Sequence, residues 1–114
     1  MKLLNFLFII AILFLISCSS NPKAEVEIIS HQQDMGCMEG IYDDVNIMFY
    51  IKNVGDCNLT NIDVYFEAET EDGNTFEDKV TIRNLKKEED LVERYYLFVD
   101  FEKYSSVKFL KIEY

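Results

Sequence analysis

The fold is decided by the stretch DVNIMFYIK, residues 44–52. Its apolar side chains recur at every second position, at Val45, Ile47, Phe49 and Ile51. Successive side chains of a β-strand point to opposite faces of the sheet, so this spacing indicates a strand with one apolar face. Residues 44–52 therefore predict a half-buried strand whose other face meets water.

The same alternation extends outward from this strand in both directions. It predicts further strands over residues 25–30, 61–70, 75–83, 91–99 and 106–114. Turn-forming stretches separate them, among them Asn53-Val54-Gly55-Asp56 and Glu71-Asp72-Gly73-Asn74, and no stretch has the apolar stripe of a helix. The spacing of strands and turns predicts an all-β fold, a β-sandwich of about six to seven strands.

Three features depart from simple alternation. Asp78 falls on the apolar face of its strand, and residues 91–99 are apolar on both faces, so their inward set is not defined. In the last strand Val107 and Phe109 are out of phase with Ile112. A β-bulge, or a strand buried on both faces, would explain that slip.

Residues 1–17 have the layout of a secretory signal. Lys2 supplies a positive charge, residues 3–16 are almost entirely apolar, and Leu15-Ile16-Ser17-Cys18 resembles the lipobox of bacterial lipoproteins. The apolar run is shorter than the roughly 20 residues that a membrane-spanning helix needs, which makes a permanent span the weaker alternative. The resemblance implies that Cys18 is acylated and opens the mature chain, with residues 18–23 as a tether and 24–114 as one domain.

A lipid on Cys18 would place the domain in the bacterial cell envelope, anchored to a membrane and facing the periplasm or the exterior. In a Gram-negative cell the outer membrane is expected. Loss of Lys2 with the signal takes the formal net charge from −10 to about −11. A surface of that sign repels phosphate groups, so the expected partner is another envelope protein and not nucleic acid.

The middle of the chain resembles a family of surface domains. The stretches Asn53-Val54-Gly55-Asp56, Leu59-Thr60-Asn61-Ile62-Asp63-Val64 and Glu71-Asp72-Gly73 are similar to the FxLYD-type and related immunoglobulin-like domains of bacteria and archaea. The resemblance covers roughly residues 45–91, and it is broken at Glu88, where those domains have glycine. It implies an immunoglobulin-like β-sandwich that acts as an accessory or interaction module without catalytic residues.

Two cysteines remain once Cys18 is assigned to a lipid. Cys37 and Cys57 are an even pair in an oxidising compartment, and a disulfide between them would add about 3 kcal/mol to so small a domain. The strand over residues 44–52 separates them by roughly 30 Å, so a bridge requires residues 38–43 to fold back along it. A bridge and two free thiols are both compatible with the sequence.

The segment 31–42 holds the single histidine of the chain. His31, Met35, Cys37 and Met38 are ligands that suit Cu(I), so a metal-binding envelope lipoprotein is the alternative function, although their spacing matches no metal motif. The simpler interpretation is a loop whose methionines cover the edge of the core. The sequence shows no nucleophile and base pattern and no glycine-rich phosphate loop, so neither catalysis nor a cofactor is expected.

A candidate interaction surface follows from the outward faces of two strands. Met48, Tyr50 and Tyr65 are large side chains on faces that would ordinarily be polar. The alternative is that the rings pair across neighbouring strands and shield the sheet. Together these features predict a lipid-anchored, non-enzymatic β-sandwich that contacts another envelope protein.

Overall fold

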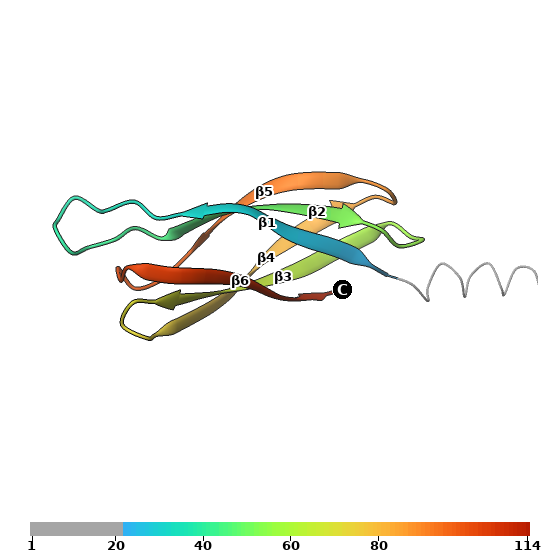
Figure 1. Ribbon diagram of the computed structural model, residues 1–114. Coiled ribbons are helices and arrows are strands. Elements are labelled where there is room, and N and C mark those ends of the chain that lie inside the picture. Colours follow the sequence, from blue (N-terminus) through green and yellow to red (C-terminus); the bar gives the residue numbers. More distant parts are fainter. Residues whose placement is uncertain (1–21) are drawn as a thin grey trace, which may run out of the picture.

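Alternating apolar residues build two sheets in the part of the chain that the computed structural model describes, residues 22–114. Their strands are β1 (Ala24–Gln32), β2 (Val45–Asn53), β3 (Leu59–Thr70), β4 (Thr75–Leu85), β5 (Asp90–Leu97) and β6 (Tyr104–Glu113). All pairings are antiparallel, and the strand orders are β1-β2-β5 in the first sheet and β4-β3-β6 in the second. Figure 1 shows the sheets as two layers. The all-β prediction is confirmed; the signal segment and Cys18 lie outside the described residues.

The core lies between the two sheets, and the central strands supply most of it. These side chains are fully buried on β2 and β3: Val45, Ile47, Phe49, Ile51, Ile62, Val64, Phe66 and Ala68. The rings of Phe49 and Phe66 meet across the sandwich with their centroids 5.0 Å apart. These are the apolar sets that the alternation predicts, so the assignment of inward faces on both central strands is confirmed.

The irregular positions have local causes. The pairing of β3 with β6 shifts register at Leu110, which is the bulge expected in the last strand. On β5 the inward side includes Leu91, Tyr95 and the buried Leu97. Asp78, in the inward register of β4, accepts a 2.5 Å hydrogen bond from the Tyr95 hydroxyl, and burial followed by this bond raises the pKa of that hydroxyl. A partner on the opposite edge thus accounts for a carboxylate on an apolar face.

The turns follow the sequence signals. In the β3-β4 hairpin Gly73 has a φ of 87° and its N–H donates to the Thr70 carbonyl at 3.0 Å. At the end of β2, the buried Asn53 donates to the carbonyls of Cys57 and Leu85 and accepts from the Gly55 N–H. Before β5, Glu88 takes a φ of 68°, a conformation that glycine adopts at no steric cost.

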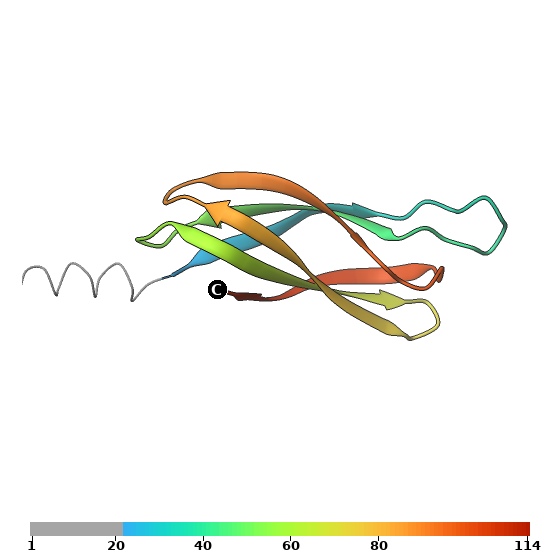
Figure 2. The same cartoon turned by 180° about the vertical axis from the view of Figure 1, so that it is seen from behind.

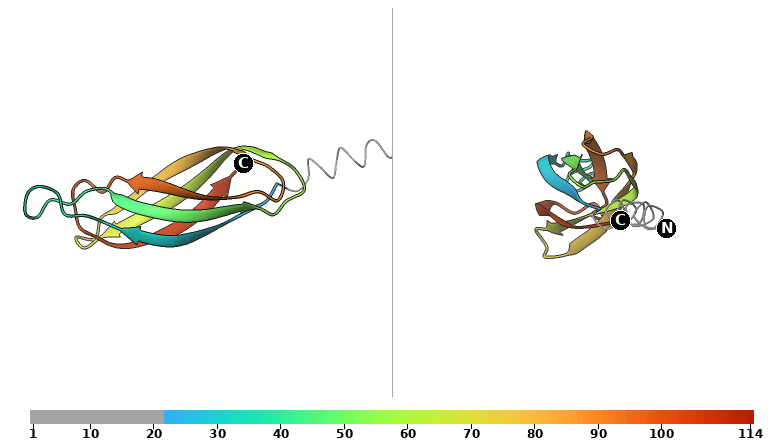
Figure 3. Two further views of the ribbon diagram at one scale, coloured as in Figure 1. Left: turned by 90° about the horizontal axis from the view of Figure 1, so that it is seen from above. Right: turned by 90° about the vertical axis from the view of Figure 1, so that its right-hand side faces the viewer.

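The connections gather at two ends of an elongated sandwich (Figures 1 and 3). One end, here called the distal end, holds residues 33–44 between β1 and β2, the β3-β4 turn and residues 98–103 between β5 and β6. The opposite, proximal end holds the start of β1 and the other two connections, as Figure 2 shows from behind. A 2.7 Å hydrogen bond from the Ala24 N–H to the Tyr114 hydroxyl joins the two ends of the described chain there.

A bridge between Cys37 and Cys57 is not formed. Cys37 is a free, exposed thiol in the β1-β2 connection at the distal end, whereas Cys57 follows β2 at the proximal end. Residues 36–43 do not fold back along β2, because they form a hairpin of their own in which the Gly36 N–H donates to the Ile41 carbonyl at 2.7 Å. The length of β2, roughly 30 Å at about 3.3 Å per residue, therefore keeps the two cysteines apart.

Candidate functional site

The three residues of the expected interaction surface lie on opposite faces of the molecule. Met48 and Tyr50 point outward from the first sheet, and Tyr65 points outward from the second. Because the two sheets pack against each other through their inner faces, these outer faces point away from each other. The structure therefore does not bring the three side chains into one patch.

Each of the two tyrosines is held by a carboxylate of a neighbouring strand. The Tyr50 hydroxyl donates to Asp90 at 3.0 Å, and the Tyr65 hydroxyl donates to Glu113 at 2.9 Å. These hydrogen bonds are the main reason why the pKa of each tyrosine is raised. The ammonium of Lys111 lies 4.7 Å from the centroid of the Tyr65 ring. The geometry matches rings that shield the sheet through cross-strand pairs.

The four candidate Cu(I) ligands lie partly on a strand and partly in an exposed connection. His31 lies on β1, where its Nδ1 is 2.8 Å from the Tyr104 hydroxyl of β6. Met35 and Met38 are exposed in the β1-β2 connection, and Cys37 is exposed beside them. Residues 22–114 contain no group of three His, Cys, Asp or Glu side chains that could hold a metal ion.

The distal end carries a row of aromatic side chains that the sequence patterns did not single out. Phe76, Phe98 and Phe101, here called the distal aromatic cluster, touch edge to face with centroid separations of 6.1 and 6.5 Å. Phe98 and Phe101 are 52% and 60% exposed, whereas the core phenylalanines are fully buried. The available signal was the spacing of Phe98 and Phe101, which lie on either side of the end of the strand predicted over residues 91–99, where the regular pattern stops.

The turn that presents Phe101 is conformationally strained. The Glu102 N–H donates to the Val99 carbonyl at 3.1 Å, and the two residues between them, Asp100 and Phe101, have φ angles of 54° and 62°. Turns with two positive φ angles favour glycine and asparagine, and a bulky side chain in that conformation costs of order 1 kcal/mol or more. The chain thus bears strain while it exposes an aromatic ring.

An acidic hollow adjoins the distal aromatic cluster. It measures about 380 Å³ and is lined by Gln32, Asp34, Asp43, Asp44, Asn46, Tyr96 and Phe101. The walls combine three carboxylates with two exposed aromatic rings, so the distal end is both apolar and negatively charged. Such a surface favours apolar groups that carry a positive charge.

The fold places the chain in the class of antiparallel β-sandwiches, and residues 22–114 contain no helix that is long and apolar enough to cross a membrane. No family model, no curated protein and no solved structure matches this chain.

Proposed function

We propose that the protein is a lipid-anchored, non-enzymatic interaction module of the bacterial cell envelope, and that its distal end binds a partner protein. The observation that carries the proposal is the exposure of Phe98 and Phe101 at the distal end, where Phe101 lies in a strained turn. Strained residues that do not serve the core are characteristic of functional sites.

The position of the proposed anchor agrees with this role. The lipobox residues 15–18 precede Ala24 by a short tether, and Ala24 lies at the proximal end of the sandwich (Figure 1). A lipid on Cys18 would hold the proximal end toward the membrane, so the distal aromatic cluster would face away from it. A partner in the envelope would then meet this end first.

The chemistry of the distal end defines the partner surface. Exposed aromatic side chains are the usual energetic centres of protein interfaces, because they bury a large area at a small entropic cost. Asp34, Asp43 and Asp44 beside them call for a rim of lysine or arginine on the partner. The partner surface is therefore an apolar pocket bordered by basic residues.

A photo-cross-linking amino acid at position 96, introduced into the full chain in its native cells, should yield one discrete adduct with the partner. The double variant Phe98→Ser, Phe101→Gly should abolish this adduct, since it removes both exposed rings. The same cross-linker at position 83, on the exposed outer register of β4, should give no adduct of that mass. Adduct formation that survives the double variant would refute the proposal.

The single variant Phe101→Gly should raise the free energy of unfolding by about 1 kcal/mol, because glycine relieves the positive φ of 62°. Urea unfolding followed by circular dichroism measures this change. If Phe101 instead stabilises the fold, its replacement by glycine will lower the free energy of unfolding. That result would show that the turn does not hold Phe101 at a cost in stability.

A further inference from the structure

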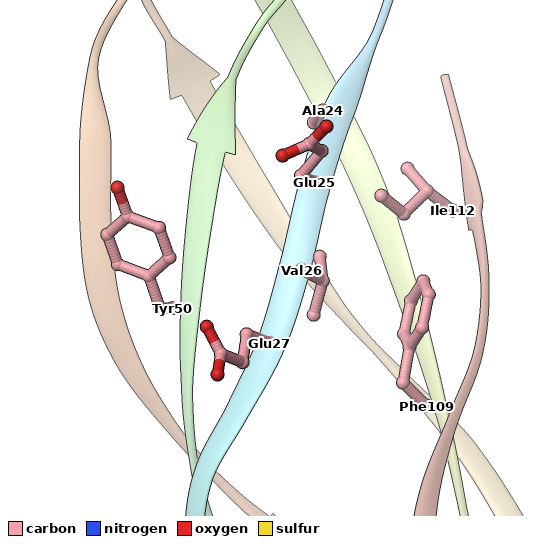
Figure 4. A pocket seen from close by; sticks show the side chains of 7 residues that line it. All are labelled: Ala24, Glu25, Val26, Glu27, Tyr50, Phe109 and Ile112. Carbon is pink, nitrogen blue, oxygen red and sulfur yellow. The ribbon is translucent and has the colours of Figure 1, made fainter.

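The two sheets meet along two sides of the sandwich, one between the edge strands β4 and β5 and one between the edge strands β1 and β6. The gap between the sheets is bridged on the first side and remains wider on the second. Where β4 meets β5, the hydrogen bond from Tyr95 to Asp78 spans the gap between the sheets. Where β1 meets β6, a groove of about 540 Å³ remains (Figure 4). It is lined by Ala24, Glu25, Val26, Glu27, Tyr50, Phe109 and Ile112. A hydrogen bond lies at each end of the groove. The Tyr114 hydroxyl accepts from the Ala24 N–H at one end, and the Tyr104 hydroxyl bonds with Nδ1 of His31 at the other.

The backbone of β1 presents an unpaired edge to this groove. β1 pairs with β2 alone, and the Lys23 carbonyl accepts from Val54 on the β2 side. The Ala24 N–H points the other way, to Tyr114 of the β6 side. Alternate residues of a strand direct their N–H and C=O groups to the same side, so Val26 and Ile28 also direct theirs into the groove. No strand of residues 22–114 pairs with them there.

The side chains around the groove alternate in character. Val26, Phe109 and Ile112 lie toward its interior and are only half-buried, whereas the inward-facing apolar residues of β2 and β3 are buried. Glu25 and Glu27 point to the outer face of the first sheet, beside Tyr50, and both are exposed. Neither glutamate has an ion-pair partner among the described residues.

We propose that this groove binds an extended segment of a partner protein in which apolar and basic side chains alternate, added as a further strand along β1. The backbone of the segment would pair with the free groups of Val26 and Ile28, as in other cases of strand addition. Every second side chain would cover Val26, Phe109 and Ile112. The side chains between them would lie next to Glu25 and Glu27.

Charge selects this occupant over a second copy of the chain. Two β1 edges placed side by side would bring Glu25 and Glu27 of both copies together, and like charges on neighbouring strands are destabilising. Lysine or arginine at the same positions would instead form opposite-charge pairs. The groove site is separate from the distal aromatic cluster, so it stands independently of the proposed function.

The test uses the full chain, purified in detergent, and a fluorescent ten-residue peptide in which valine alternates with lysine. Fluorescence anisotropy should show saturable binding. Glu25→Lys with Glu27→Lys should weaken it by roughly tenfold or more and should permit binding of a peptide in which valine alternates with glutamate. The matched control, Glu39→Lys with Asp72→Lys, changes the net charge equally but lies at the distal end, and it should bind the lysine peptide as the wild type does.

A second variant tests the backbone pairing. Val26→Pro removes an N–H that faces the groove and leaves the β1-β2 hydrogen bonds intact, so the fold should persist by circular dichroism while peptide binding is lost.

Two outcomes would overturn the proposal. If the double variant at Glu25 and Glu27 and the control double variant at Glu39 and Asp72 lose peptide affinity equally, the peptide is attracted by the overall negative charge of the protein and not by the groove. A dimer of the wild-type chain that the peptide does not dissociate would assign the groove to a second copy and would also overturn it. Removal of Phe98 and Phe101 should leave peptide binding unchanged, which separates this outcome from that of the distal site.

Discussion

Replacement of Cys18 by alanine should abolish fatty-acid incorporation and leave the signal segment uncleaved. The sulfur of Cys18 is the proposed attachment point of the lipid, and no other side chain of the lipobox offers a nucleophile of that kind. Several acyl chains, each stabilised by about 0.8 kcal/mol per buried methylene, give anchoring that one short chain does not provide. Because the proposed anchor depends on Cys18, we expect the Cys18→Ala variant to lose the anchor completely and not in part.

Metabolic labelling with a fatty-acid analogue and the mass of the mature chain measure this result. Cys37→Ala is the matched control, because Cys37 is an exposed thiol far from the tether and should incorporate the label as the wild type does. A Cys18→Ala chain that is still processed and retained in the membrane would mean that the anchor lies elsewhere. The residues available for disulfide pairing would then have to be reassigned as well.

Replacement of Phe66 by alanine should lower the free energy of unfolding by about 4 kcal/mol. Phe66 is fully buried on the central strand of the second sheet, and its ring meets those of Phe49 and Phe109 at centroid distances of 5.0 and 6.3 Å. The two sheets are fixed in place, so they cannot collapse fully into the space that the ring leaves. Small domains are stable by only about 5–15 kcal/mol, so this variant should be close to unfolding.

Phe98→Ala deletes the same atoms from an exposed position and serves as the control. Its ring is 52% exposed and packs edge to face against Phe76 and Phe101, so we expect a loss of about 1 kcal/mol or less. Urea unfolding of both variants, monitored by circular dichroism, gives the comparison. Equal destabilisation by the two substitutions would contradict the division between a buried core and an exposed distal cluster.

The central strands were predictable from sequence because their environment is simple. β2 and β3 are each paired on both edges and covered on one face, so alternation alone identifies their inward side chains. The edge strands β4 and β5 were less predictable, since Asp78 and Tyr95 satisfy each other across the two sheets. Neither residue can be interpreted without knowing that the other faces it.

The candidate surfaces were less predictable still, because alternation identifies a face of a strand but not the sheet to which the strand belongs. Tyr50 and Tyr65 both lie on the outward faces of strands that follow each other in the sequence. These strands, β2 and β3, belong to different sheets, so the two side chains point to opposite faces of the molecule. The sequence left the pairing of Cys37 with Cys57 open for a related reason, since it does not determine the direction of the β1-β2 connection. The distal aromatic cluster depends on three segments that are brought together only by the fold.

The exposed thiol at the distal end gives the molecule a natural chemical reporter of its compartment. A membrane-impermeant maleimide added to intact cells will modify Cys37 when the domain is displayed on the cell exterior. When the domain faces an enclosed space, the same reagent will modify it only after the outer barrier is opened. Cys37→Ala identifies the signal as coming from this thiol, so the sidedness of the protein can be measured without an added tag.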